Sequence, residues 1–472
     1  MDNDVQKLSV KEKVGYAVGD LAANLIFQTL MTFIAFFYTD VYQIPTETAS
    51  AIIFFVGLFA AIIFNPLMGM IADRTNTRWG KFRPWILWTA VPFGIVSVLA
   101  FSTPDFGPTG KVIYAAVTYT LLLVLYAANN LPYAALSGVI TGSMAERNSI
   151  SSYRFVAVMV AQFIIQVLLY PIVNIVGDGN KAAGFETVMT FLAISGTILL
   201  FITFFTTKER VVPSPGQKSS IKEDLGDLVK NRPWIIMLTL TTLVFVTLAL
   251  KGGMYIYYFV NYVSAPALTD FFSGLGITNL DDVAGYGFSV FNAGGIIFMI
   301  VGIAFSKKLA DKYGKRDVFA VALFLSTVFL IVFYFYPPDA IAIIFVTQIL
   351  HGFFYGITIP LLWAMIADVA DYSEWKNHRR ATATIFSAMM VGLKLGLTFG
   401  GALVAAILGA YGYSPQLAEQ DPQAINGIKL SISVYAAAPF LIGIALLYFY
   451  EINKRMELTI EGDLKTRRIE QQ

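Results

Sequence analysis

Four charged residues stand inside long apolar stretches of the sequence, where a charge is costly. They are Asp20, Arg154, Lys251 and Lys394. Inside a membrane, such side chains line a cavity or pair with one another. If all four are ionised, they leave a net charge of about +2 in that cavity, which favours an anionic ligand.

The residue types exclude several other chemistries. The 472 residues include no cysteine and 2 histidines, His351 and His378. A thiol nucleophile and a Cys-ligated metal site are therefore excluded, and two histidines barely begin a His-based metal site. With 33 Lys and Arg against 31 Asp and Glu, no basic surface for a nucleic-acid partner is expected. We expect neither a bound metal nor a cofactor.

The elements that must position the charged residues are membrane-spanning helices. The chain is 57% apolar and 14% charged, whereas soluble proteins average about a quarter charged. Runs of about 20 apolar residues, the length of a helix that crosses the hydrocarbon core, recur along the chain. They predict an all-α membrane protein with twelve transmembrane helices, at 14–38, 47–72, 84–102, 112–138, 153–176, 187–206, 234–262, 285–306, 317–336, 340–369, 382–411 and 428–450.

The positions of Lys and Arg predict the orientation of these helices. With a cytoplasmic N-terminus, 27 of the 33 fall on the cytoplasmic side, and Lys111, Lys181 and Lys429 fall on the opposite side. Positively charged loops are retained in the cytoplasm. We therefore predict a multi-pass protein of the inner (cytoplasmic) membrane, embedded in its lipid bilayer, with both termini cytoplasmic. The long loops 263–284 and 412–427 leave room for re-entrant segments.

Two similar segments divide the chain into halves. Gly69–Trp85 and Ile303–Phe319 each place Ala-Asp, a basic residue and then Gly-Lys before the next apolar run. This repeat predicts two pseudo-symmetric six-helix bundles, as in a transporter, rather than a channel or an enzyme. The predicted parts are an N-terminal six-helix bundle at 1–206, a cytoplasmic linker at 207–233 with a short amphipathic helix at 219–230, a C-terminal six-helix bundle at 234–450 and a cytoplasmic tail at 451–472.

Charged residues at the helix ends of both segments predict a cytoplasmic gate. Ion pairs between them would latch neighbouring helices in one conformation. Three acidic residues near the end of the tenth span extend the set, and a solvated charged turn is the alternative. The predicted gate residues are Asp73, Arg74, Arg78, Lys81, Asp311, Lys315, Arg316, Asp368, Asp371 and Glu374.

Several longer motifs follow one another along the chain. They include FYTDVY (37–42), DRTNTRWGKFRPWILW (73–88), NNLPYAALSGVI (129–140), ERNSISSYRF (146–155) and ADVADYSEWK (367–376). With Asp20 and Lys394, this set resembles the glycoside-pentoside-hexuronide:cation symporters of the major facilitator superfamily. The resemblance runs from about residue 8 to about residue 450. It implies the major facilitator fold and import of a sugar or glycoside by alternating access, with a site between the halves.

The resemblance also implies roles for the charged residues. Asp20 matches a carboxylate that accepts hydrogen bonds from sugar hydroxyls, Arg154 a sugar-contacting arginine, and Lys394 a lysine that organises the site or its coupling. The alternative is an ion pair between Asp20 and Arg154 that only holds helices one and five together. Aromatic rings that stack on sugars, or merely pack, complete the set. The predicted substrate-binding residues are Asp20, Asn130, Arg154, Lys251, Lys394, Tyr126 and Trp363.

The chain departs from the sodium-coupled melibiose permease pattern at three positions. Where that pattern has aspartates, this chain has Ala61, Asn65 and Asn130. Neutral amides supply oxygen ligands without charge, so a sodium site of that design is not expected. We expect a proton as the coupling cation, or no coupling ion. The coupling candidates are Asp20, Asn65, Asn130, His351, which titrates near neutral pH when unperturbed, and Lys394.

The net positive charge of the four residues inside the membrane predicts which kind of sugar the chain transports. It favours an acidic sugar, such as a uronate-containing oligosaccharide. Lysines that burial renders neutral would remove this preference. The alternatives are a sodium-coupled symporter of neutral oligosaccharides, a carrier of lipids, peptides or drugs, and a membrane-embedded enzyme.

Overall fold

The computed structural model describes residues 7–141, 143–210, 230–278, 280–377, 382–417 and 419–470. The chain divides into two compact units, Met1–Gly216 (unit 1) and Gln217–Gln472 (unit 2). The division falls inside the predicted linker 207–233. The amphipathic helix predicted at 219–230 lies, apart from its last residue, outside the described residues, and the four-part division of the chain stays a prediction.

Twelve helical stretches of the described residues are long and apolar enough to cross a membrane. They confirm the predicted all-α fold with twelve transmembrane helices, and each unit contributes six of them. Most ends agree with the predicted spans within a few residues. Four ends differ by six or seven residues. The sixth stretch begins at Lys181 rather than at residue 187 and the last at Pro422 rather than at 428. The eighth stretch ends at Tyr313 rather than at residue 306 and the tenth at Lys376 rather than at 369.

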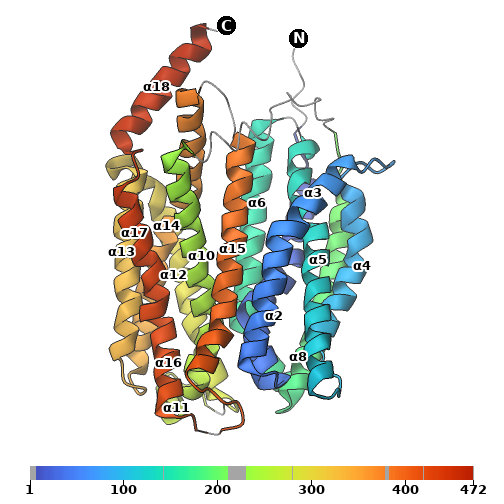
Figure 1. The fold of residues 1–472 in the computed structure, drawn as a ribbon, viewed down its shortest axis with the longest axis vertical. Helices are drawn as coiled ribbons and strands as arrows, with labels where there is room; N and C mark the ends of the chain where they lie inside the picture. The colour runs from blue at the N-terminus through green and yellow to red at the C-terminus, as the bar shows by residue number, and fades with distance from the viewer. Residues whose placement is uncertain are drawn as a thin grey trace. The chain divides into compact units, whose positions relative to one another are not determined.

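In unit 1, π-helical turns join several of the helices. One such turn extends α1, another joins α2 to α3, and a third joins α6 to α7. The helices are α1 (Val10–Phe36), α2 (Thr46–Phe59), α3 (Asn65–Arg74), α4 (Arg83–Ala100), α5 (Pro108–Ile140), α6 (Met144–Phe163), α7 (Tyr170–Gly177) and α8 (Lys181–Thr206) (Figure 1).

Capping residues explain where two helices of unit 1 begin. Ser9 precedes α1 and Ser143 precedes α6, and each hydroxyl accepts a hydrogen bond from the backbone N–H three residues later. These N–H groups belong to Glu12, at 3.2 Å, and Glu146, at 3.4 Å. A serine three residues before a glutamate is the sequence signature of a capping box, which satisfies helix N–H groups that lack an intrahelical partner.

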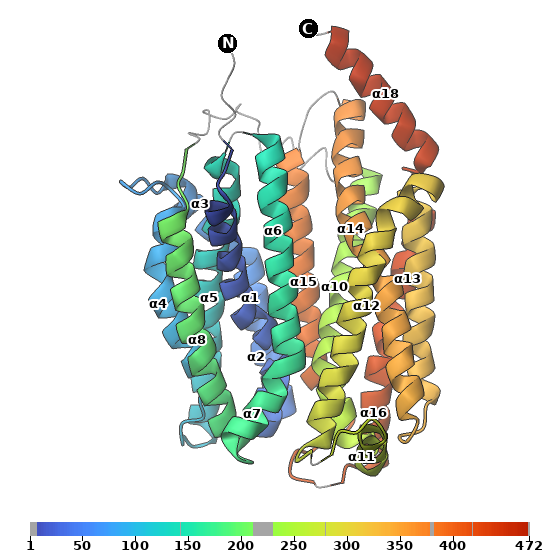
Figure 2. The same cartoon turned by 180° about the vertical axis from the view of Figure 1, so that it is seen from behind.

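Helix α1 is the centre of packing in unit 1, because it lies against both α6 and α8 (Figure 2). Close approach of α1 and α8 depends on two glycines of α1. A Cβ atom at Gly15 would overlap the side chain of Thr206, and one at Gly19 would overlap Thr203 and Tyr133. The small residues therefore bring the backbone around residue 20 into the middle of the bundle.

Unit 2 has a similar set of long helices and two shorter ones near its loops. The loop 263–284 contains α11, whose ten residues are too short to span a membrane. The helices are α10 (Arg232–Asn261), α11 (Ala265–Gly274), α12 (Val283–Tyr313), α13 (Lys315–Val332), α14 (Ile341–Asn377), α15 (Thr382–Ala410), α16 (Pro422–Ile432), α17 (Val434–Tyr448) and α18 (Lys454–Glu470).

Glycines set two close helix pairs in unit 2. Helix α14 lies against α12, where a Cβ atom on Gly352 would overlap the carbonyl oxygen of Gly295 (Figure 2). Helix α15 lies against α10, where a Cβ atom on Gly396 would overlap the carbonyl oxygen of Thr242 (Figure 1). Small residues let membrane helices gain packing energy through backbone contact, which lipid cannot supply.

Candidate functional site

In unit 1, Asp20 of α1 and Arg154 of α6 form a salt bridge inside the membrane-spanning region. The Nε atom of Arg154 lies 2.5 Å from Oδ2 of Asp20. The Asp20 side chain is 2% exposed and that of Arg154 is 36% exposed. Asn24, one turn further along α1, donates a hydrogen bond to Oδ1 of Asp20 at 3.0 Å. The carboxylate is therefore held on both of its oxygens, while the guanidinium keeps an open side.

Two stacked tyrosines lie beside this salt bridge. The rings of Tyr16 and Tyr133 stack with centroids 4.6 Å apart. Each hydroxyl donates to the backbone oxygen of the other residue, at 3.2 Å and 2.7 Å. The guanidinium carbon of Arg154 lies 5.7 Å from the centroid of the Tyr133 ring, within range of a cation–π contact. The tyrosines tie α1 to α5 and hold Arg154 in place.

In unit 2, Lys251 of α10, His351 of α14 and Ser326 of α13 form a chain of polar contacts. The Nζ atom of Lys251 lies 2.5 Å from Nε2 of His351, and Nδ1 of His351 lies 2.9 Å from the hydroxyl of Ser326. All three residues are buried. The ammonium also lies 5.4 Å from the ring centroid of Tyr355 and 5.9 Å from that of Tyr255. The sequence offered no sign that these three residues would meet.

The structure shows no acidic partner for the lysines of unit 2 among the described residues. Neither Lys251 nor Lys394 takes part in a salt bridge there. Lys394, on α15, is half-buried and hydrogen-bonds to no described residue. The buried charge of this unit is therefore not neutralised by a carboxylate of the described chain, in contrast to unit 1.

The other predicted site residues are half-buried and make fewer polar contacts than Asp20 and Lys251 do. Tyr126 stacks on Phe27 with centroids 4.8 Å apart, and Asn130 is half-buried. Its neighbour Asn129 is the fully buried amide, and it donates to the hydroxyl of Thr89 at 2.8 Å. Asn65 and Trp363 are also half-buried. The contacts that support the charged residues come from side chains that the sequence analysis missed, namely Tyr16, Asn24, Ser326 and Tyr355.

At the ends of the helices in unit 1, Glu209 organises the first predicted gate segment. Its carboxylate accepts hydrogen bonds from the backbone N–H groups of Lys81 and Phe82 at 2.8 Å and of Arg83 at 2.9 Å. The Nη2 atom of Arg83 also donates to the backbone oxygen of Phe204 at 2.6 Å. A carboxylate at a helix N-terminus satisfies unpaired N–H groups, so Glu209 joins the start of α4 to the end of α8.

Three further contacts hold the same end of unit 1. Arg210 makes a bidentate pair with Glu12, at 2.7 Å and 2.9 Å. Lys13 lies 2.9 Å from Glu146, which also accepts a hydrogen bond from the backbone N–H of Leu8 at 3.1 Å. The Lys13 ammonium and then the Leu8 N–H hold the pKa of the Glu146 carboxyl below its usual range. These contacts join the start of α1 to α6 and to the segment after α8.

In unit 2, Lys315 is the centre of the corresponding segment. Its Nζ atom lies 2.6 Å from Oδ1 of Asp368 on α14 and 2.7 Å from Oε1 of Glu457 on α18. The Nζ atom of Lys454, also on α18, donates a hydrogen bond to the backbone oxygen of Asp311 at 2.7 Å. Lys315 thus joins three helices at the point where α13 begins.

The remaining predicted gate residues make more local contacts. Arg316 lies 2.8 Å from its neighbour Asp317. The guanidinium carbon of Arg78 lies 4.5 Å from the centroid of the Trp79 ring. Arg74 is exposed, Asp371 is exposed and Glu374 is half-buried, whereas the side chain of Asp73 lies outside the described part of the structure. Their role in a gate stays a prediction.

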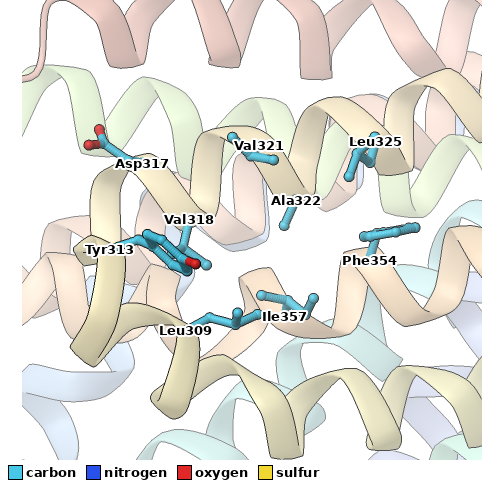
Figure 3. Close-up of a pocket in the computed structure, with 9 residues that line it drawn as sticks. All are labelled: Leu309, Tyr313, Asp317, Val318, Val321, Ala322, Leu325, Phe354 and Ile357. Carbon is cyan, nitrogen blue, oxygen red and sulfur yellow. The ribbon is translucent and has the colours of Figure 1, made fainter.

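A pocket of about 420 Å³ lies between α12, α13 and α14. Figure 3 shows Tyr313 and Leu309 on one side, Val318 and Ala322 on the next helix, and Phe354 and Ile357 on the third. Apart from Asp317 and the Tyr313 hydroxyl, the labelled side chains are apolar. None of the predicted substrate-binding residues lines this pocket, so it is separate from the charged site.

Comparison with known proteins begins with a family model described as MFS/sugar transport protein, which matches residues 15–280 and 281–454. The inner membrane symporter YicJ of Escherichia coli is 38% identical over 97% of this chain and 94% of its own length. The isoprimeverose transporter of Lactiplantibacillus pentosus is 30% identical over 94% of this chain and 89% of its own length. The glucuronide carrier protein homologue of Escherichia coli is 28% identical over 99% of this chain and 98% of its own length.

The fold is also similar to that of solved transporters. The crystal structure of a bacterial homologue of the human lysosomal transporter Spinster superimposes with a TM-score of 0.65. The match covers 96% of this chain and 99% of the other, at 14% sequence identity. At that identity the likeness concerns the fold alone, and it agrees with the two sets of six membrane-spanning helices.

Proposed function

Because the chain belongs to the MFS/sugar transport proteins, and within them to the glycoside-pentoside-hexuronide:cation symporters, we propose that it imports a sugar or glycoside by alternating access. It is a transporter rather than an enzyme, as its family and its structural neighbours are. Its membrane is the inner membrane, the location named for the relative YicJ.

The observation that carries the proposal is the partly open salt bridge of unit 1. Arg154 uses Nε to bind Asp20, and its two Nη groups hydrogen-bond to no described residue. Those N–H groups are arranged to donate to two adjacent hydroxyls or to a carboxylate of a bound sugar. Asp20 is an acceptor-only group, which suits hydroxyl donors. We assign substrate binding to these two residues, with Asn130, Lys251, Lys394, Tyr126 and Trp363 as further contacts.

An acidic glycoside fits the charges better than a neutral one. Asp20 and Arg154 neutralise each other, so Lys251 and Lys394 supply the excess positive charge. An excess charge in a low-dielectric region is stabilised by a ligand of opposite sign. The glucuronide carrier protein homologue among the relatives supports this choice. A sodium-coupled symporter of neutral oligosaccharides is the second candidate.

The coupling cation in this proposal is a proton. The positions that match the aspartates of a sodium-coupled pattern are Ala61, Asn65 and Asn130, which carry no charge. Ala61 lies in the π-helical turn that joins α2 to α3, and Asn65 follows that turn. Without anionic oxygens, such a group would bind a sodium ion weakly.

We also place both termini in the cytoplasm, on the strength of the Lys and Arg distribution. The contacts of Lys315 with α14 and α18, and of Glu209 with the start of α4, then lie at the cytoplasmic ends of the helices. There they stabilise one arrangement of the helix ends and have to rearrange when the other forms.

Uptake into proteoliposomes tests the function. The matched substrates are 4-nitrophenyl β-glucuronide and 4-nitrophenyl β-glucoside, which differ only at C6. We expect accumulation of the glucuronide under an inward proton gradient without sodium, and little competition by the glucoside. Accumulation that requires a sodium gradient, or equal competition by the glucoside, would favour the sodium-coupled carrier of neutral sugars.

A further inference from the structure

The buried contact between Lys251 and His351 fixes where their protons lie. A lysine ammonium has donors and no acceptor, so Nε2 of His351 has to accept the hydrogen bond from Nζ at 2.5 Å. On the other side of the ring, Nδ1 lies 3.0 Å from the backbone oxygen of Ser326, which only accepts. Both partners therefore assign the hydrogen of the neutral imidazole to Nδ1.

This arrangement holds one excess proton and resists a second. With Lys251 charged, a proton added to Nε2 would face the ammonium, with no hydrogen-bond acceptor left between the two nitrogen atoms. With Lys251 neutral, its amine and Nε2 share the binding of one returning proton. The pair therefore alternates between zero and one positive charge, and it titrates as a unit.

Among the described residues, the groups in contact with the pair contribute no charge of opposite sign. The titratable side chains in contact with it are the phenols of Tyr255 on α10 and Tyr355 on α14. Of the helices that pack on α10 and α14, α12 and α13 carry their charged residues near the ends where they meet, and α17 carries none. Helix α16 carries Lys429, a cation, and α11 carries Asp270. Helix α18, which carries several acidic residues, meets α14 near Asp368 through Lys315. Helix α15 carries Lys394, a second cation. Asp368 stands 17 residues from His351 on α14, which is about 25 Å along the helix.

We propose that the Lys251–His351 pair is the site that binds and releases the coupled proton, which rests on the proposed function being proton-coupled transport. The Nζ atom of Lys251 changes between the amine and the ammonium by taking one proton from water on one side and giving it to water on the other. Nε2 of His351 accepts the hydrogen bond from the ammonium and shares the returning proton with the amine, and the backbone oxygen of Ser326 fixes the tautomer of the ring.

The charge of the pair also explains how proton and substrate are linked. The ammonium form attracts an anionic substrate, and a bound anion stabilises the ammonium form in return. Linkage requires that these two effects be equal in size. Asp20 serves this purpose poorly, because Arg154 already neutralises it and a proton on its carboxylate would break their salt bridge.

The first experiment compares two modes of transport in proteoliposomes that contain the full chain. Proton-driven accumulation needs the pair to take up and release its proton, whereas exchange of labelled for unlabelled glucuronide requires no net proton movement. In His351→Gln, the amide oxygen still accepts from Lys251 but cannot hold a proton. We expect accumulation to fall about tenfold or more while exchange continues. The matched control is His378→Gln, the other histidine of the chain, which retains both modes.

The outcomes separate this inference from the proposed function. If the unsubstituted protein accumulates glucuronide under a proton gradient and His351→Gln does so equally well, the pair is not the proton site. If the unsubstituted protein shows no proton-driven accumulation, the proposed coupling fails before the pair is tested.

A spectroscopic measurement keeps the inference testable if His351→Gln does not fold. In His378→Gln labelled with ¹⁵N-histidine, the single remaining histidine reports its own tautomer. We expect a neutral ring with hydrogen on Nδ1 at neutral pH, and the same tautomer in the further variant Ser326→Ala, which keeps the backbone oxygen that accepts from Nδ1. A ring that is doubly protonated at neutral pH, or that carries its hydrogen on Nε2, would overturn the assignment.

Discussion

In unit 1 the buried charge is shared by Asp20 and Arg154, 2.5 Å apart, whereas in unit 2 the buried Lys251 meets the uncharged ring of His351 at the same distance. The first site is neutral without a ligand, because each charge has a partner of opposite sign. The second lacks an acid among the described residues and gains from binding an anion or from losing a proton. The two units each contain six membrane-spanning helices, but their buried polar groups differ in net charge.

The largest effect is expected from Asp20→Asn, which breaks the neutral site. Arg154 would be left without an anion, at a cost of about 3 kcal/mol, the low end for a buried pair because Arg154 is 36% exposed. Thermal unfolding in detergent and glucuronide uptake measure both consequences, and we expect a lower melting temperature with no uptake. The double variant Asp20→Asn/Arg154→Gln should recover stability without recovering transport. Unchanged melting of the single variant would contradict a salt bridge that stabilises the fold.

Lys251→Met tests the other side of the comparison. Removing this lysine leaves no unpaired opposite charge, and the loss is limited to the hydrogen bond to His351, about 1 kcal/mol. We therefore expect transport to be lost while the melting temperature stays close to that of the unsubstituted protein. The control Lys429→Met, at a lysine that lies over the rings of Tyr262 and Tyr334, should keep transport. A large destabilisation by Lys251→Met would mean that its charge is neutralised after all.

Gly352→Ala examines the backbone that positions His351. A methyl group there would overlap the carbonyl oxygen of Gly295, so α14 has to move away from α12. Overpacking of this kind costs about 1–3 kcal/mol. In Gly138→Ala, where nothing lies within 4 Å of the added atom, the alanine should be neutral or stabilising. Equal melting temperatures of the two variants would show that the close contact is not tight.

The smallest effect concerns Glu146, a half-buried residue outside the membrane-spanning stretches, which serves as a reference for the buried pairs. Because its pKa is lowered in the folded protein, its contribution to stability is present above the unfolded pKa and disappears as the pH falls through the folded value. Glu146→Gln should therefore reduce the melting temperature slightly at neutral pH and have no effect in acid. Melting curves from neutral pH down to below about pH 4 follow this change. A difference that persists in acid would point to a cause other than charge.

The spans and the four charged residues inside them could be predicted from the sequence. A charge within 20 apolar residues is conspicuous, and its cost indicates a site before any contact is known. Some supporting residues also leave a signal. Asn24 follows Asp20 by four residues, as Tyr355 follows His351, and this spacing places both members on one face of a helix.

The partners across helices could not be predicted. Ser326 stands beside Thr327 on α13, and its contact with His351 depends on how α13 packs against α14. Glu209 was also missed, because it binds backbone N–H groups, which every residue type carries. The two gate segments look alike in sequence, but Lys315 makes side-chain ion pairs, whereas Lys81 contributes its backbone N–H.

Glu209 and Arg210 fasten the segment that follows α8 to the rest of unit 1. Glu209 is held by three backbone N–H groups at the start of α4, and Arg210 is held by the carboxylate of Glu12 and by the backbone oxygen of Val139. The polypeptide is thus anchored up to its last described residue in this unit. A break in the peptide chain engineered after Arg210 would remove none of these contacts, so the gene could be divided there into two reading frames.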